Sequence, residues 1–198
     1  MEDTDKDRFL NYLAGLIAGD GDLYYRRSKG EYRIRVSDSS KEFLTSLSNL
    51  INKSLGIRAR VYKHHKYNCF ILVIYNKKLY YEILRRIESN INLPTIEFAR
   101  GLLDAEGGIT KSGKKGVVRI HFTNKQYRLV KSFTTVLDKL GIKYYLTRSG
   151  SKFKVFIQNK TNVCLTIKTL KPTHPKIIKQ ALMFLNNCRI APSGSRTG

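Results

Sequence analysis

Leu13-Ala-Gly-Leu-Ile-Ala-Gly-Asp-Gly21 is an apolar run that ends in an acid and a glycine, and a related run occurs later in the chain. Ala99-Arg-Gly-Leu-Leu-Asp-Ala-Glu-Gly107 repeats its pattern at an offset of 86 residues. The two runs place Asp20 and Glu106 at the same position, just before the final glycine. The repeat makes this pair of acids the first candidate for a functional site.

The similarity continues beyond these two runs. Leu55-Gly-Ile57 matches Leu140-Gly-Ile142, and the stretch 70–77 matches 153–160. Self-similarity at a nearly constant offset is the sequence signature of a structural repeat. The chain is therefore an internal duplication, with short loop deletions in the second copy.

Each copy shows the same order of elements. β-rich stretches are interrupted by glycine-containing turns, and apolar residues such as Phe43, Leu47 and Ile51 recur at helical spacing before a glycine. In the first copy we expect a helix at 9–19, a hairpin at 24–36, a helix at 41–55, a hairpin at 58–75 and a helix at 77–89. In the second copy the corresponding stretches are 96–105, 109–122, 126–140, 143–157 and 161–170.

These elements predict an α+β fold of two α-β-β-α-β-β-α units related by a pseudo-two-fold axis. Each unit would contribute one antiparallel four-stranded sheet, and the two sheets together would form a saddle. We expect an N-terminal subdomain at 1–89, a linker at 90–95, a C-terminal subdomain at 96–190 and a flexible tail at 191–198.

The charge of the chain indicates its class of partner. It carries 37 Lys and Arg against 15 Asp and Glu, a net charge of +22, which favours a polyanion. A membrane-spanning segment is not expected, because no apolar run approaches the length of about 18 residues that a spanning helix needs. The N-terminus is acidic and lacks the basic start of a signal peptide, so we expect an intracellular location, in the cytoplasm.

The small residues of the two runs predict how the acids come together. Gly15 and Gly19 lie on one helical face, which lets a second helix approach backbone to backbone. We therefore expect the two helices to pack against each other, with Asp20 and Glu106 at their C-terminal ends. There the negative ends of the helix dipoles and each other's charge disfavour two carboxylates, and a divalent cation would relieve both penalties.

The expected metal has oxygen ligands. The three cysteines and four histidines show no zinc spacing. Carboxylates completed by backbone carbonyls, at Gly19 and Ala105, suit Mg²⁺ or Mn²⁺ better than a metal that prefers nitrogen or sulfur. No organic cofactor is expected.

At this point the residues resemble a known family, the LAGLIDADG homing endonucleases of the two-motif, monomeric type, and are similar to its archaeal intron-encoded members. The resemblance covers residues from about 9 to 170, with Ala18 and Gly19 where the family name has Asp and Ala. It implies site-specific cleavage of both strands of a long, asymmetric DNA target across the minor groove, with Asp20 and Glu106 as metal ligands.

The resemblance also implies a basic residue that orders water near each scissile phosphate. Lys125 matches that position in the second copy. In the first copy the offset points to Ser39, with Lys41 two residues away, so the basic residue of that half stays open.

The strands carry the side chains expected to contact double-stranded DNA. In Tyr32-Arg-Ile-Arg-Val36, alternation places the two arginines on one face and the apolar residues on the other. The expected DNA-binding residues are Arg26, Arg33, Arg35, Arg60, Lys63, Lys111, Arg119, His121, Arg148, Lys152 and Lys154. Two alternatives stay open on the same fold: an RNA-binding intron maturase and a DNA-binding regulator that does not cleave.

Overall fold

The structure is a computed structural model that describes residues 4–112 and 117–185. The first unit comprises helix α1 (Asp5–Asp20), strand β1 (Gly21–Arg26), a 3-10 turn η1 (Arg27–Lys29), β2 (Glu31–Asp38), α2 (Lys41–Leu55), β3 (Arg60–Lys63), β4 (Phe70–Tyr75) and α3 (Lys77–Asn92). The second comprises α4 (Ile96–Glu106), β5 (Gly107–Ser112), β6 (Val117–Asn124), α5 (Tyr127–Lys139), β7 (Tyr145–Ser149), β8 (Lys152–Ile157), α6 (Lys160–Leu170) and α7 (Pro175–Leu185). The expected tail at 191–198 lies outside the described residues.

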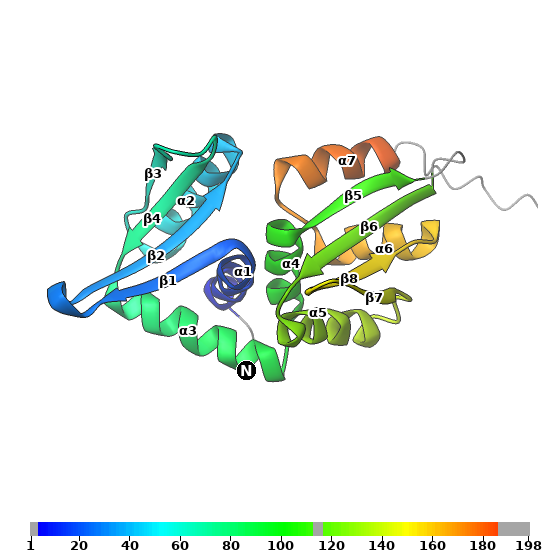
Figure 1. The fold of residues 1–198 in the computed structure, drawn as a ribbon, viewed down its shortest axis with the longest axis horizontal. Coiled ribbons are helices and arrows are strands. Elements are labelled where there is room, and N and C mark those ends of the chain that lie inside the picture. The colour runs from blue at the N-terminus through cyan, green and yellow to red at the C-terminus, as the bar shows by residue number, and fades with distance from the viewer. Residues whose placement is uncertain (1–3, 113–116, 186–198) are drawn as a thin grey trace, which may run out of the picture.

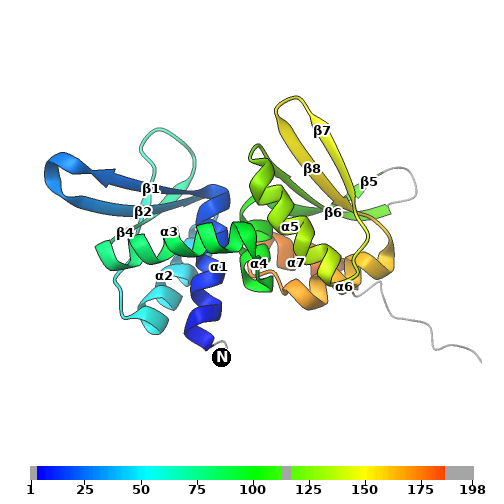
Figure 2. The ribbon, with the colours of Figure 1, turned by 90° about the horizontal axis from the view of Figure 1, so that it is seen from below.

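The predicted duplication and element order are confirmed. Each unit forms one antiparallel four-stranded sheet, with the orders β1-β2-β4-β3 and β5-β6-β8-β7. The sheets lie on either side of a central pair of helices, α1 and α4 (Figure 1). The strands of both sheets lie on the side of the molecule opposite to the N-terminal end of α1 (Figure 2).

The second helix of each unit ends at the glycine that the sequence indicated. Gly56 follows α2 with φ 65°, and Gly141 lies just beyond α5, also with φ 65°. This left-handed conformation is one that glycine adopts without strain. The Leu-Gly-Ile triplets are therefore helix ends that turn the chain toward β3 and β7.

Alternation along the strands separates a core face from an open face. Ile34 and Val36 of β2 are buried, and they pair with Ile74 and Leu72 of β4, which are buried too. The second sheet buries Ile120, Phe122, Val155 and Ile157 on its corresponding face. The opposite face of each sheet, which we call the outer face, carries mostly polar and aromatic side chains.

The connection between the units is shorter than the expected linker. Helix α3 continues to Asn92, into the stretch 90–95. Asn90 is buried, and its Oδ1 accepts hydrogen bonds from the backbone N–H and the hydroxyl of Thr95, at 2.9 and 2.8 Å. Thr95 in turn caps α4 by accepting from the N–H of Phe98. The chain therefore passes tightly from one unit to the next.

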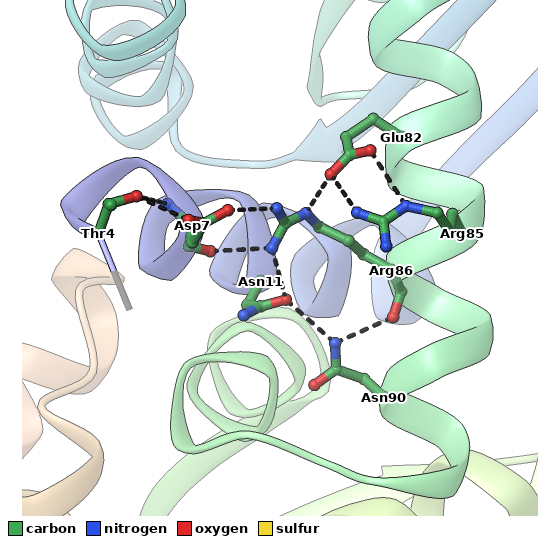
Figure 3. A network of polar contacts seen from close by, with 7 residues as sticks. All are labelled: Thr4, Asp7, Asn11, Glu82, Arg85, Arg86 and Asn90. Carbon is green, nitrogen blue, oxygen red and sulfur yellow. Dashed lines mark hydrogen bonds and ion pairs between the residues drawn. The ribbon is translucent and has the colours of Figure 1, made fainter. Parts of the chain in front are cut away.

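A polar network fixes α3 to the start of α1 (Figure 3). Arg86, which is largely buried, contacts Asp7 at 2.6 Å and Glu82 at 2.6 Å and also donates to the side chain of Asn11 at 3.1 Å. Hydrogen bonds from Thr4 and Arg86 hold the pKa of Asp7 below its ordinary value. The contacts anchor the end of α1 that lies far from the two acids.

Helix α7 was not expected from the sequence. Ile177, Ala181 and Phe184 are buried at helical spacing. The helix lies along β5, an edge strand, where the side-chain oxygen of Gln180 accepts the backbone N–H of Ile109 at 3.2 Å (Figure 1). It thereby satisfies a donor on an otherwise open sheet edge.

Candidate active site

The small residues of α1 and α4 allow their backbones to touch. A Cβ on Gly15 would overlap the backbone carbonyl of Phe98, and one on Gly101 would overlap the carbonyl oxygen of Tyr12. Nearer the helix ends, a Cβ on Gly19 would lie 2.5 Å from that of Ala105. The predicted small-residue contact between the two helices is therefore present along their length.

Each helix stops at its acid because the next residue is a glycine. Gly21 and Gly107 have extended backbones, with φ of −97° and −105°, and their N–H groups bond to Ile17 and Leu103. A Cβ on Gly21 would lie 2.5 Å from the Cα of Ile17, and one on Gly107 would lie 2.5 Å from the carbonyl oxygen of Leu103. Glycine is thus required for space, and the chain passes directly from each acid into the first strand of its sheet.

The helix ends bring Asp20 and Glu106 into one site. The Glu106 side chain lies against Gly19, since its Cγ would be 3.4 Å from a Cβ there. The pKa of Asp20 rises to about 7, because the surrounding protein removes part of its hydration and because the charges of Glu106 and Asp38 lie close by. Desolvation also raises the pKa of Glu106, while Lys152 and Asn124 act in the opposite direction.

Two residues at equivalent positions distinguish the two halves of the site. Asn124, the last residue of β6, donates from Nδ2 to Oε1 of Glu106 at 3.1 Å. Asp38, the last residue of β2, occupies the corresponding place in the first unit and lies 3.0 Å from Nε2 of His174. Neither residue was predicted from the sequence as part of the site. The available signal was that Asn124 directly precedes Lys125, which was expected to act near Glu106.

A buried carboxylate within the second motif was also missed. Asp104 accepts hydrogen bonds from the hydroxyl of Tyr12 at 3.1 Å, from the hydroxyl of Thr173 at 2.6 Å and from the backbone N–H of Thr173. Desolvation raises its pKa. The signal was an acid between Leu103 and Ala105, at the position where the first copy has Ala18.

The residues considered as auxiliary bases are exposed near the ends of strands. Lys125 directly follows Asn124, whose amide contacts Glu106. In the first unit Ser39 follows Asp38, and Lys41 begins α2. The chain therefore places Lys125 and Ser39 equivalently, as the offset predicted.

All the expected DNA-binding residues lie on strands, but they do not share one face. By register, the outer faces carry Arg26, Arg33, Arg35, Arg60, Arg119, His121, Lys152 and Lys154. Lys63, Lys111 and Arg148 instead pair across from Phe70, Val118 and Phe153, on the core-facing side near strand ends. The guanidinium of Arg148 accordingly lies over the ring of Phe153, 5.4 Å from its centroid.

Three arginines of the outer faces contact aromatic rings or an acid. Arg33 lies over the ring of Tyr24, at 4.7 Å, and Arg119 over that of Phe156, at 5.7 Å. Arg35 forms a 2.7 Å ion pair with Asp22, so part of its charge is neutralised. Cationic groups that alternate with exposed aromatic rings are suited to the backbone and bases of a nucleic acid.

Within residues 4–112 and 117–185, no group of three or more His, Cys, Asp and Glu side chains is arranged to hold a metal ion. None of the helices in these ranges is long and apolar enough to cross a membrane.

The duplicated helices, the paired acids and the two sheets define the class of this protein. Residues 9–88 and 94–169 each match the LAGLIDADG-like domain, and the chain belongs to that family.

Particular members of known activity are similar to it. Homing endonuclease I-DmoI from Desulfurococcus mucosus is 28% identical over 158 residues, 75% of this chain and 78% of that protein. Homing endonuclease I-ApeI from Aeropyrum pernix is 29% identical over 154 residues, 68% of this chain and 67% of that protein. The crystal structure of I-DmoI in complex with DNA and Mn has a TM-score of 0.67 and 23% identity, and covers 86% of this chain and 99% of that one.

Proposed function

We propose that this chain is a site-specific homing endonuclease, which makes a double-strand break in a long, asymmetric DNA target by metal-dependent phosphodiester hydrolysis across the minor groove. The observation that carries the proposal is the pair of carboxylates, Asp20 and Glu106, at the ends of two packed helices between two basic sheets. The names of the relatives, two homing endonucleases, support it.

The acids fit a divalent cation such as Mg²⁺ or Mn²⁺. Desolvation raises the pKa values of both Asp20 and Glu106, and Gly19 and Ala105, whose carbonyls would complete the ligand set, directly precede them in the chain. When bound, the metal would neutralise charge at the scissile phosphate and activate a water molecule. The complex of I-DmoI with DNA and Mn agrees with this choice of cation.

The chain's own residues would position the substrate and the acids. The outer faces would hold the duplex, since β-ribbons can enter a major groove and arginine can read guanine. Asn124 orients Glu106, and Lys125, next to it in the chain, would order water at that half. With one acid for each DNA strand, a single polypeptide can act as a pseudo-symmetric monomer. It would act inside the cell, with access to genomic DNA.

Loss of the acids tests the proposal. A randomised duplex library with Mg²⁺ should yield a discrete cleaved sequence with short 3′ overhangs. On that target Asp20→Asn or Glu106→Gln should lower cleavage by at least about 10³-fold, while the affinity for DNA stays within a few-fold, because the outer faces are unchanged.

Glu88→Gln is the matched control, since this acid is exposed on α3, away from the site. It should leave both cleavage and binding unchanged. Bound but uncut DNA with the wild-type protein would favour the non-cleaving regulator, and preferred binding of RNA would favour the maturase. No observation on the described residues favours either alternative.

A further inference from the structure

A short segment of the second unit crosses to the first unit beside the acids. It comprises residues 171–174, between α6 and α7, and we call it the strap. Asp104 of α4 holds it by accepting from the backbone N–H of Thr173 at 2.9 Å and from its hydroxyl at 2.6 Å. The hydroxyl of Tyr12, on α1, lies 2.7 Å from the Thr173 hydroxyl. Both central helices thus fix the strap.

The strap places His174 against the first unit. The residue is buried, and its ring packs on that of Phe43 with 4.6 Å between centroids. Nδ1 of His174 accepts the backbone N–H of Lys176 at 3.2 Å, so the ring proton lies on Nε2. Nε2 therefore donates to Oδ2 of Asp38, at 3.0 Å.

Asp38 occupies the place that Asn124 has in the second unit. Both residues end the second strand of their sheet, and both pair across from a phenylalanine, Phe70 or Phe153. Asn124 donates to Glu106 and so orients it. Asp38 is an acid with no N–H to donate, and it accepts hydrogen bonds from His174 and from the N–H of Ser40.

The end of β2 that carries Asp38 lies beside Asp20, because Gly21, which follows Asp20, pairs with Val36, two residues before Asp38. A carboxylate this near to a candidate metal ligand would disturb the ligand if its own position were not fixed. The hydrogen bond from His174 fixes the position of Asp38. Residues that do not touch a metal themselves commonly orient the groups around it in this way.

We propose that His174 is a positioning residue for the Asp20 half of the site: it holds Asp38 in place, so that this half depends on a strap supplied by the other unit. The inference rests on the proposed function and deepens it. The two strands of the target are then cut by halves that differ chemically, one supported by Asn124 and the other by Asp38 and His174.

The full-length protein tests this with a target duplex labelled on each strand in turn. In single turnovers with Mg²⁺, His174→Ala should slow the strand cut by the Asp20 half by about 10 to 100-fold. The other strand should change by less than about threefold. His174→Gln keeps an N–H donor and should recover a large part of the lost rate.

Asn124→Ala is the matched control, and it should slow the opposite strand. The ratio of the two strand rates is decisive, because a loss of stability lowers both rates together. A ratio that His174→Ala and His174→Gln both leave unchanged would overturn the inference while the endonuclease proposal stands. A wild-type protein that cuts neither strand would overturn both.

A second readout needs neither metal nor DNA. In ¹⁵N spectra of the metal-free protein, His174 should show a proton on Nε2, and Asp38→Ala should shift that signal. Asp38→Asn keeps an acceptor and should preserve it. A proton on Nδ1, or no response to Asp38→Ala, would contradict the contact on which the inference depends.

Discussion

At the scale of single residues, the two acids share a position in their motifs but not an environment. Asn124 donates to Glu106, and Lys152 lies close enough to lower its pKa. Asp20 instead faces the charges of Glu106 and Asp38. The more strongly perturbed acid is therefore Asp20, and its proton should be the more sensitive to pH and to metal.

The pKa of Asp20 makes stability depend on pH. Folding raises it from 3.8 to about 7, so in this window the folded protein binds a proton that the unfolded chain releases. The Asp20 contribution to the free energy of unfolding therefore falls as the pH rises from about 4 to about 7. Because the side chain is solvent-accessible, we expect a loss of about 1 kcal/mol, or about 2–4 °C in Tm.

Thermal unfolding with a chelator, at pH 5 and pH 8, measures this loss. Asp20→Asn should show a smaller difference between the two pH values than the wild type does. Comparison with the variant is needed because Glu106 contributes in the same direction and His121, whose pKa is lowered by burial, contributes in the opposite one. Equal pH dependence of wild type and variant would show that folding does not raise the pKa of Asp20.

Residues of the site differ in how far the sequence predicts them. Asp20 and Glu106 could be found because the duplication shows an acid at the same position of both motifs. Asp104 and His174 could not, because their roles depend on a strap that is about 70 residues from α4 in the chain but packs against it. Only the fold shows that a histidine of one unit contacts Asp38 of the other.

At the scale of elements, the contact between α1 and α4 depends on glycine. Gly15→Ala adds a methyl group that collides with the backbone carbonyl of Phe98. Alanine would favour the helix by up to about 1 kcal/mol, but overpacking costs about 1–3 kcal/mol, and a backbone atom cannot move aside easily. We expect a net destabilisation of about 1–2 kcal/mol, measured by denaturant unfolding.

Ser46→Ala is the control for helix propensity, because Ser46 is exposed in the middle of α2. It should leave stability unchanged or raise it slightly. Gly101→Ala, on the opposing helix, should behave as Gly15→Ala does, since its Cβ would collide with the Tyr12 carbonyl oxygen. A stabilised Gly15→Ala variant would mean that the two helices are not in backbone contact.

The positions of the strands were predicted better than the face of the sheet on which each side chain lies. Alternation placed Arg33 and Arg35 opposite the buried residues of β2. It could not place Lys63 or Arg148, because a shift of one residue in register moves a side chain to the other face. Helix α7 was missed, although Pro175 and the spacing of Ile177, Ala181 and Phe184 are typical of a helix start and a buried face.

At the scale of the whole molecule, the charge predicts how binding responds to salt. The net charge is +22, and the outer faces carry cationic residues from both units. If about 6–10 of these meet phosphates, affinity for a target duplex should fall by about 10³ to 10⁵ between 50 and 200 mM salt. Titrations of binding at several salt concentrations, with Ca²⁺ or without metal, measure the slope.

Substitutions on the two faces refine that prediction. Lys154→Ala, on an outer face, should reduce the slope by about one, whereas Lys63→Ala, on the core-facing side, should reduce it less. An equal effect of both would indicate that DNA wraps around the strand ends. Affinity that does not respond to salt would contradict contact through the outer faces.

The sequence by itself determined the duplication, the order of the elements, the pair of acids and the polyanionic class of partner. The first three follow from local sequence patterns, each of which occurs in both copies of the repeat. The class of partner follows from composition. Tertiary structure alone decided which cationic side chains share a face of a sheet. It also decided that the strap of the second unit contacts Asp38 of the first. Those features depend on strand register and on contacts between residues far apart in the chain, and no local pattern specifies either. The asymmetry of the two half-sites therefore appears only when the duplicated units are folded against each other.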